Sequence, residues 1–246
     1  MDKLLYVAMS GAKEILRAQA ANSHNLANAN TTGFKADLSA FQSRAVTGPG
    51  YASRVYATDA SVGWDSSVGS QITTGNPLDV AVQGQGFIAV QDSQGNEAYT
   101  RAGDLHVDPN GQLLNSAGLQ VLGDNGPISV PPSTSVSVAP NGNISVVPLG
   151  QTPNTISIVG RIKLVNPSSD TVSRGSDGLF RTNNGQPADS DATTTLASGV
   201  LEGSNVDLAG SMVDMIELSR NFDLQIKALH AAEDNGTASA KLLTSS

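Results

Sequence analysis

Cysteine is absent from this chain of 246 residues, and aromatic residues make up only 4% of it. Without cysteine the protein forms no disulfide and has no thiolate nucleophile. A cytosolic protein can lack cysteine by chance, and a chain exported unfolded into an oxidising space does well without it. Because 39% of the residues are hydrophobic, we still expect a substantial core, built from Val, Leu, Ile and Ala.

Positive charge is also scarce. The chain has 14 Lys and Arg against 22 Asp and Glu, a formal net charge of −8, and no basic cluster. Nucleic acid and anionic membrane surfaces are therefore not expected partners.

Long apolar runs are missing as well. No run approaches the roughly 20 residues that cross a bilayer, so we expect no membrane insertion. The stretch Leu4 to Met9 is too short for the apolar core of a signal peptide, and Lys13 and Glu14 follow it closely. If the protein leaves the cytosol, we expect a route without a cleaved signal.

The first 27 residues have a helical pattern. From Lys3 to about Ala27, a series of positions that starts at Leu5 and ends at Leu26 recurs at alternating steps of three and four residues, as in a heptad seam. Asp2 is a plausible N-cap. The seam becomes polar towards its end at Gln19 and Asn22. Its apolar members, predicted to form an assembly seam, are Leu5, Ala8, Ala12, Ile15 and Leu26.

A second helix is predicted from about Asp207, the expected N-cap, to Leu243. At ~1.5 Å per residue it would be ~54 Å long. It can pair with the first helix and close a monomer as a hairpin, or pair with copies from other chains. The residues predicted to form its assembly seam are Leu208, Met212, Met215, Leu218, Phe222, Ile226, Leu229 and Leu243.

The middle of the chain favours short strands joined by tight turns. Asn110-Gly111 and Asn141-Gly142 are hairpin signals between strand-like runs, and "GRIKLV" (160–165) reads as one strand. The fold class is α+β: long terminal helices that pair as a coiled-coil-like segment, with a central all-β domain. We expect a terminal-helix assembly domain (1–35 plus 203–246), an irregular connector (36–76) with at most one strand at 54–58, and the β domain (77–202).

The stretch "NLANANTTGFKA" (25–36) is predicted to end the first helix and turn the chain into the connector. Asparagine and threonine side chains can bond the backbone groups that a helix end leaves free. Gly33 permits a turn that a β-branched residue would resist, and Phe34 can anchor the outgoing chain. The residues of this helix-to-connector turn are Asn25, Asn28, Asn30, Thr31, Gly33 and Phe34.

No catalytic, metal or cofactor site is predicted. Asp104, His106 and Asp108 share one strand face, but no further His or Glu cluster completes a coordination shell, so a solvated face is the better interpretation. "GQGFIA" (84–89) resembles a dinucleotide fingerprint, but a strand follows where a helix is needed. We therefore expect neither an enzyme nor a small-molecule binder.

Several segments resemble the flagellar basal-body rod and hook protein family. They are "SHNLANANTTGFKA", "GNPLDVAVQGQGFIAV", "YTRAGDLHVDPNGQLLNSAGLQVLG" and "GVLEGSNVDLAGSMVDMIELSRNFDLQIKAL". They occur in the family's order and span nearly the whole chain. The resemblance departs at 208–210, where Leu-Ala-Gly stands in place of the Pro and Glu often found in related rod sequences.

The resemblance implies a structural subunit of the basal-body rod, an axial shaft that crosses the periplasm and transmits torque from motor to hook. It implies export through the flagellum's own type III apparatus, assembly with copies of itself and other rod proteins through the terminal helices, and no catalysis or cofactor. A place in the proximal rod is favoured. The alternatives are a distal rod or hook-type axial protein or, in a different class, a secreted monomeric β-protein such as an adhesin.

Overall fold

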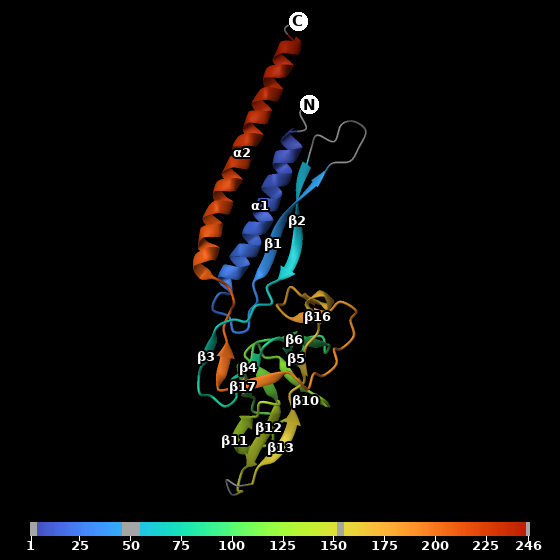
Figure 1. The fold of residues 1–246 in the computed structure, drawn as a ribbon, viewed down its shortest axis with the longest axis vertical. Helices are drawn as coiled ribbons and strands as arrows, with labels where there is room; N and C mark the ends of the chain where they lie inside the picture. The colour runs from blue at the N-terminus through green and yellow to red at the C-terminus, as the bar shows by residue number, and fades with distance from the viewer. Residues whose placement is uncertain (1–3, 46–54, 152–154, 245–246) are drawn as a thin grey trace. The chain divides into compact units, whose positions relative to one another are not determined.

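The computed structural model describes residues 4–45, 55–151 and 155–244 (Figure 1). The chain forms two compact units. The helix unit comprises Met1–Ala27, Asp37–Trp64 and Val206–Ser246, and the β unit comprises Asn28–Ala36 and Asp65–Asn205. The α+β class predicted from the sequence is confirmed.

The helix unit contains two helices and a two-stranded ribbon. Helix α1 (Leu4–Ala27) packs on α2 (Leu208–Thr244) and on the antiparallel ribbon of β1 (Asp37–Ala45) and β2 (Val55–Trp64). In Figure 1 α1 lies between α2 and the ribbon. The helices run antiparallel, since Asn22 contacts Ser211 while Gly11 lies against the side chain of Gln225.

Both predicted helices are present, within a residue or so of the expected limits. The N-cap predicted for the second helix is confirmed, because Asp207 Oδ1 accepts the backbone N–H of Ala209 at 3.1 Å. Asp2, the other predicted cap, lies outside the described residues. Neither helix has a stretch in the described residues that is long and apolar enough to span a membrane. The supercoiled packing of a coiled coil stays a prediction.

The predicted irregular connector is wrong over residues 37–45 and 55–64, which form two strands. Instead of a loop with one short strand, β1 and β2 pair over the whole of both strands, with a bulge between Leu38 and Ser39. This ribbon has a weak signal in the sequence, because adjacent apolar residues such as Ala40-Phe41 and Val55-Tyr56-Ala57 interrupt the alternation typical of a half-buried strand. In the structure both strands lie against α1. The predicted Gly48-Pro49-Gly50 break and Arg54 lie outside the described residues.

The β unit is built from short strands. They are β3 (Gln71–Thr73), β4 (Val80–Gln83), β5 (Phe87–Gln91), β6 (Glu97–Thr100), β7 (Leu105–Val107), β8 (Leu113–Asn115), β9 (Gln120–Gly123), β10 (Gly126–Pro127), β11 (Ser133–Val138), β12 (Asn143–Pro148), β13 (Ser157–Arg161), β14 (Leu164–Val165), β15 (Val172–Arg174), β16 (Phe180–Thr182), β17 (Thr195–Ser198) and β18 (Val200–Glu202), with a 3-10 turn, η1 (Ser169–Thr171), before β15.

These strands form four antiparallel sheets. The largest has nine strands, in the order β15-β16-β6-β5-β9-β8-β7, with β10 added beside β9 and β14 beside β5. A second sheet has the order β11-β12-β13, and two strand pairs join β17 to β4 and β18 to β3. The last two pairings bring strands near the end of the β unit against strands near its beginning, so the unit closes only when almost all of its chain is in place.

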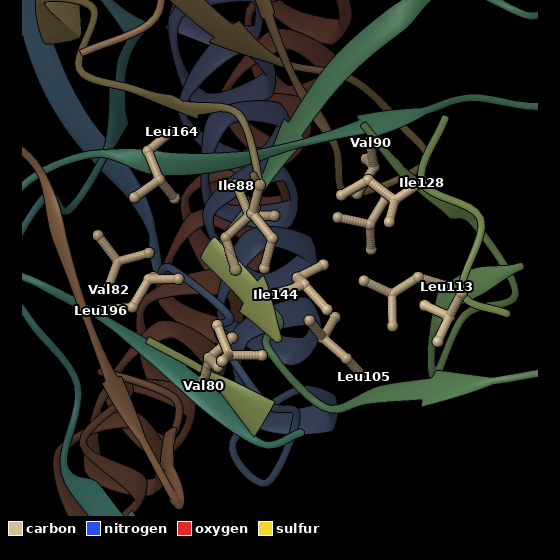
Figure 2. Close-up of a cluster of buried hydrophobic side chains, with 14 of the residues drawn as sticks. Val80, Val82, Ile88, Val90, Leu105, Leu113, Ile128, Ile144, Leu164 and Leu196 are labelled. Atoms are coloured by element: carbon tan, nitrogen blue, oxygen red, sulfur yellow. The ribbon is translucent and has the colours of Figure 1, made fainter. Parts of the chain in front are cut away.

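One apolar cluster holds these sheets together. Figure 2 shows its aliphatic side chains converging from β4, β5, β7, β8, β12, β14 and β17. Val80, Ile88, Leu113 and Ile144 are completely buried. The cluster is aliphatic, as the scarcity of aromatic residues predicts. Phe87 and Phe180, which are also buried, form an aromatic pair with ring centroids 4.9 Å apart.

Turn chemistry in the β unit follows the sequence closely. Both predicted hairpins are present, β7–β8 across Asn110-Gly111 and β11–β12 across Asn141-Gly142. The single strand predicted at 160–165 is wrong: β13 ends at Arg161 and β14 begins at Leu164. Ile162 between them is fully buried, because the chain there leaves one sheet and enters another.

Replacing Ile144 tests the core. Ile144→Ala deletes buried apolar volume from β12 and leaves a cavity, so we expect it to destabilise the protein by about 2–5 kcal/mol. The matched control is Ile158→Ala on the neighbouring strand β13, whose side chain is 65% exposed and whose loss should cost less than about 0.5 kcal/mol. Urea unfolding of both variants measures the difference, and equal midpoints would contradict a shared core.

Candidate assembly surface and the segment after the first helix

Helix α1 buries a face of small residues. Ala8, Ala12, Ile15 and Ala18 are each less than 9% exposed. Small side chains allow close approach of another backbone, and Gly11 lies on the same side, where an added Cβ would come 3.2 Å from Gln225. Of the predicted seam, Ala8, Ala12 and Ile15 lie on this face, Leu26 is half-buried, and Leu5 is exposed.

Polar groups lie inside the helix pair. Asn22 is buried and donates from Nδ2 to the Ser211 carbonyl oxygen at 2.6 Å. Glu14 is also buried, with Arg17 of the same helix 3.2 Å from its carboxylate. A buried polar contact across a helix pair favours one register, because sliding the helices would leave its groups unpaired.

Helix α2 is much less covered. Of the predicted seam, Met215, Leu218, Phe222, Ile226 and Leu229 are half-buried. Leu208 and Met212 are exposed, and the Leu243 side chain lies outside the described residues. The structure thus shows which seam residues are covered within one chain. It leaves their role in assembly as a prediction.

A further set of apolar side chains projects outward from both helices, each 50–59% exposed. We call it the outer apolar set: Tyr6, Met9, Leu16, Met212, Val213, Ile216 and Leu224. Apart from Met212, the heptad analysis missed these residues because it followed one seam per helix. The available signal was apolar residues on more than one side of each helix, which indicates burial on more than one side.

The predicted helix-to-connector turn is divided between the two units. Asn25 belongs to the helix unit, where its Oδ1 accepts the Asp37 backbone N–H at 2.8 Å and its Nδ2 donates to the Asp37 carbonyl oxygen. His24 adds a contact of 2.8 Å to the Asp37 carboxylate. Asn25 therefore fastens the start of β1 beside the end of α1.

The remaining turn residues begin the β unit. Thr31 donates its backbone N–H to the Asn28 carbonyl oxygen and its hydroxyl to Asn28 Oδ1, both at 3.1 Å, while Asn30 is exposed. Phe34 lies under Arg174, whose guanidinium carbon is 4.7 Å from the ring centroid, a cation–π distance. Phe34 therefore contacts the β unit, and its anchoring of the chain against the connector stays a prediction.

Gly33 is required by both conformation and space. Its φ is +69°, and a Cβ there would lie 2.3 Å from the carbonyl carbon of Arg101. Its backbone N–H donates to the Glu202 carbonyl oxygen at 2.8 Å. The segment 28–36 is thus pressed against two distant parts of the β unit at a position where a side chain has no room.

Three buried charges lie beside this glycine, and the sequence did not reveal them. Lys35 Nζ and Arg101 Nε each lie 2.7 Å from a different oxygen of the Glu202 carboxylate. All three side chains are no more than 2% exposed. No sequence pattern could pair them, because Lys35 and Arg101 lie 167 and 101 residues from Glu202. We call these residues the Glu202 cluster.

Hydrogen bonds satisfy the remaining groups of the Glu202 cluster. Lys35 also donates to the Ser67 carbonyl oxygen, and Glu202 also accepts the Gly69 backbone N–H. Arg101 donates to the carbonyl oxygen of Val82 in β4 and to those of Gly84 and Gly86 in the turn that follows. Burial of its ammonium group lowers the pKa of Lys35, despite the hydrogen bond to Glu202.

The glycines of the "GQGFIA" stretch have a structural role that involves no nucleotide. Gly84 and Gly86 both have positive φ, at 75° and 129°, and they form a turn between strands β4 and β5. Arg101 occupies the carbonyl groups on the inside of this turn.

Asp104, His106 and Asp108 do not form a site. His106 is exposed, and Asp108 accepts the backbone N–H groups of Asn110 and Gln112 in the hairpin turn. The Gln112 bond in particular lowers the pKa of Asp108. Asp104 forms a bridge with Asp79, and its Oδ1 is buried without a hydrogen-bond partner. In the part of the chain that the structure describes, no three His, Cys, Asp or Glu residues are grouped to hold a metal ion.

Three family models match segments of this chain. Residues 5–35 match a model described as flagella basal body rod protein, 81–146 match the flagellar hook protein FlgE/F/G D1 domain, and 197–242 match the flagellar basal body rod FlgEFG protein C-terminal model. Lys35, Arg101 and Glu202 each fall in a different matched segment.

Whole-length relatives carry the same family name. The flagellar basal-body rod protein FlgF of Escherichia coli K12 is 41% identical over the full length of both chains. FlgF of Salmonella typhimurium LT2 is 40% identical, again over both full lengths. FlgG, a flagellar basal-body rod protein of Bacillus subtilis 168, is 31% identical over 95% of this chain and 96% of the relative.

The Glu202 cluster predicts an unequal response to loss of its charges. Glu202→Gln leaves two buried cations without a counter-charge, so we expect a loss of about 3–5 kcal/mol. Lys35→Met leaves the pair of Arg101 and Glu202 balanced and should cost about 1–3 kcal/mol, the cost of unsatisfied hydrogen-bonding groups. Denaturant unfolding measures both.

The control for these variants is Glu97→Gln. Glu97 pairs with Lys163 at 2.8 Å, and both side chains are 16% exposed, so water can replace part of the contact and the loss should be about 0–1 kcal/mol. If Lys35→Met and Glu202→Gln lower the free energy of unfolding equally, the unbalanced charge of the cluster does not determine the cost of losing Glu202.

Gly33→Ala tests the close approach of segment 28–36 to Arg101. The new methyl group would overlap backbone atoms in a conformation that costs an L-residue about 1–2 kcal/mol. We expect segment 28–36 to detach from the β unit, which limited proteolysis followed by mass spectrometry would detect as new cleavage there. Gly118→Ala, also at positive φ but with open space around it, controls for backbone strain alone and should not produce that cleavage.

Proposed function

This chain belongs to the flagellar basal-body rod protein family and is a structural subunit of the rod, and from that premise we propose that its terminal helices make the contacts between subunits. The observation that carries the proposal is the outer apolar set, seven large side chains exposed on α1 and α2. Large exposed apolar groups gathered on one pair of elements are typical of interaction surfaces. The partners are copies of this chain and other rod proteins.

The magnitude of the burial supports contact through both helices. Fully burying a large apolar side chain is worth about 1.5–3 kcal/mol, so seven that are already half-covered could add roughly 5–10 kcal/mol. Association itself costs an estimated 4–15 kcal/mol. The three or four side chains of one helix would contribute about half of that gain, near the lower limit of this cost, whereas both helices reach the middle of its range. Contacts with neighbours on more than one side add to the gain. Contacts of this heterologous kind, which do not close into a ring, build filaments.

We propose a coiled-coil-like arrangement for these helices in the rod, with the predicted seam residues as its inner face. Within one chain the half-buried seam of α2, including Met215 and Phe222, faces α1 only in part. Neighbouring subunits would complete its burial. The assembled subunits then help the shaft to transmit torque from motor to hook.

The place along the rod is proposed to be proximal. Relatives aligned over the full length of both chains at 40% identity or more are named flagellar basal-body rod protein FlgF, and the family resemblance of the sequence favours the proximal rod. The distal rod and the hook remain the alternatives within the family. We further propose export through the flagellar type III apparatus without a cleaved signal, residence in the periplasm, and no catalytic step.

The decisive experiment replaces residues of the outer apolar set. Ile216→Asp and Leu224→Asp put carboxylates where the free subunit is already exposed, so the purified protein should unfold at the same denaturant concentration as the parent. In an assembled rod each would be a buried, unpaired charge. We therefore expect cells that express either variant at parental levels to be non-motile, with basal bodies that lack a completed rod.

Two comparisons complete this experiment. Ile158→Asp alters an equally exposed side chain of the β unit and should leave motility unchanged. Phe222→Asp should destabilise the free chain as well as block the rod, since Phe222 is half-buried in the helix unit. Motile cells carrying Ile216→Asp would refute assembly through this surface.

A further inference from the structure

The chain passes between the helix unit and the β unit four times, after residues 27, 36, 64 and 205. Three stretches of the β unit lie next to these passages. They are residues 28–36, 65–69 and 202–205, which we call the crossing segments. How these segments are held within the β unit determines whether they move separately or together.

Asn205 bonds to both of the other crossing segments. Its Oδ1 accepts the Ala36 backbone N–H at 2.7 Å, and its Nδ2 donates to the carbonyl oxygens of Asp65 and Ser67 at 3.0 and 3.2 Å. The Asp65 backbone N–H in turn donates to the Ala36 carbonyl oxygen at 2.8 Å. One amide side chain thus joins all three segments.

Glu202, three residues earlier, also joins the three segments, through its charged carboxylate. Its carboxylate binds Lys35 of the first segment and the Gly69 N–H of the second, while Lys35 also donates to the Ser67 carbonyl oxygen. Releasing any one segment would therefore leave buried charged or polar groups without partners. Leaving these groups unpaired costs much more free energy than the net contribution of their hydrogen bonds, because the groups are buried away from water.

We propose that Glu202 and Asn205 act as a clamp that makes the three crossing segments open and close as one cooperative unit. The clamp rests on this geometry alone. Its role in the rod rests on the proposed function. When both terminal helices are held in rod contacts, an applied load passes through the four passages of the chain, and a clamp that holds the crossing segments together distributes that load among all four passages. Glu202 and Asn205 are positioning residues in this scheme, since neither is assigned a contact with a partner.

Hydrogen exchange followed by mass spectrometry on the purified full-length protein tests the clamp. Asn205→Ala should accelerate exchange about tenfold in all three crossing segments, a factor equal to ~1.4 kcal/mol, while strands β5 and β9 keep their protection. Asn183→Ala, which removes a single exposed side-chain bond to the Asp170 carbonyl oxygen, is the control and should change none of them. Acceleration confined to 202–205 would overturn the proposal.

A double-mutant cycle gives a second, independent readout. Lys35 and Asn205 share the Ser67 carbonyl oxygen, so under the clamp Lys35→Met and Asn205→Ala together should destabilise the protein by clearly less than the sum of the single changes. Additive effects would overturn the clamp even if either variant proves less stable than expected.

Motility separates the clamp from the proposed function. Cells carrying Asn205→Ala should complete the rod but lose swimming speed in viscous medium more steeply than the parent. Unchanged speed at every viscosity would overturn the use of the clamp under load. Failure of the Ile216→Asp experiment concerns a different surface and leaves the exchange result on the clamp unaffected.

Discussion

The neutralisation of one buried carboxylate is the interaction on which the β unit depends. Glu202 is held by Lys35 from the start of the chain and Arg101 from its middle. Three full charges in an interior are tolerated only where each is paired and every remaining group is bonded, and the carbonyl oxygens of two turns meet that condition here. Gly33 lies against the backbone of two of these residues, since its N–H donates to the Glu202 carbonyl oxygen and a Cβ would overlap the Arg101 backbone.

The helix unit has the opposite character. It leaves large apolar side chains uncovered, above all on α2. A chain that functioned as a monomer would gain stability by making these positions polar. A rod subunit gains from keeping them apolar, since the surface that is exposed in the free chain becomes the contact in the assembly. The aliphatic core of the β unit and its local turns give that unit a stability that does not require neighbours.

Local signals in the sequence were reliable where a structure depends on neighbouring residues. The limits of both helices, the cap at Asp207 and the two Asn-Gly hairpins follow from periodicity and turn chemistry. The signals failed at the β1–β2 ribbon, because the pairing of weakly patterned strands depends on the helix that lies beside them. They also failed at Ile162, because the change from one sheet to another there depends on the strands on either side. The turn residues that were predicted as one group are divided between the units, since Asn25 belongs to the helix unit and Phe34 to the β unit.

The sequence by itself determined the α+β class, the helical termini and, through its shared segments, membership of the rod family. Only the tertiary structure decided that Lys35, Arg101 and Glu202 meet, since a charge in a sequence carries no sign of its partner until the chain brings the two together. It also decided which faces of the helices remain uncovered. Periodicity gives the spacing of apolar residues around a helix, but which of those residues lose contact with water depends on the elements that pack against it.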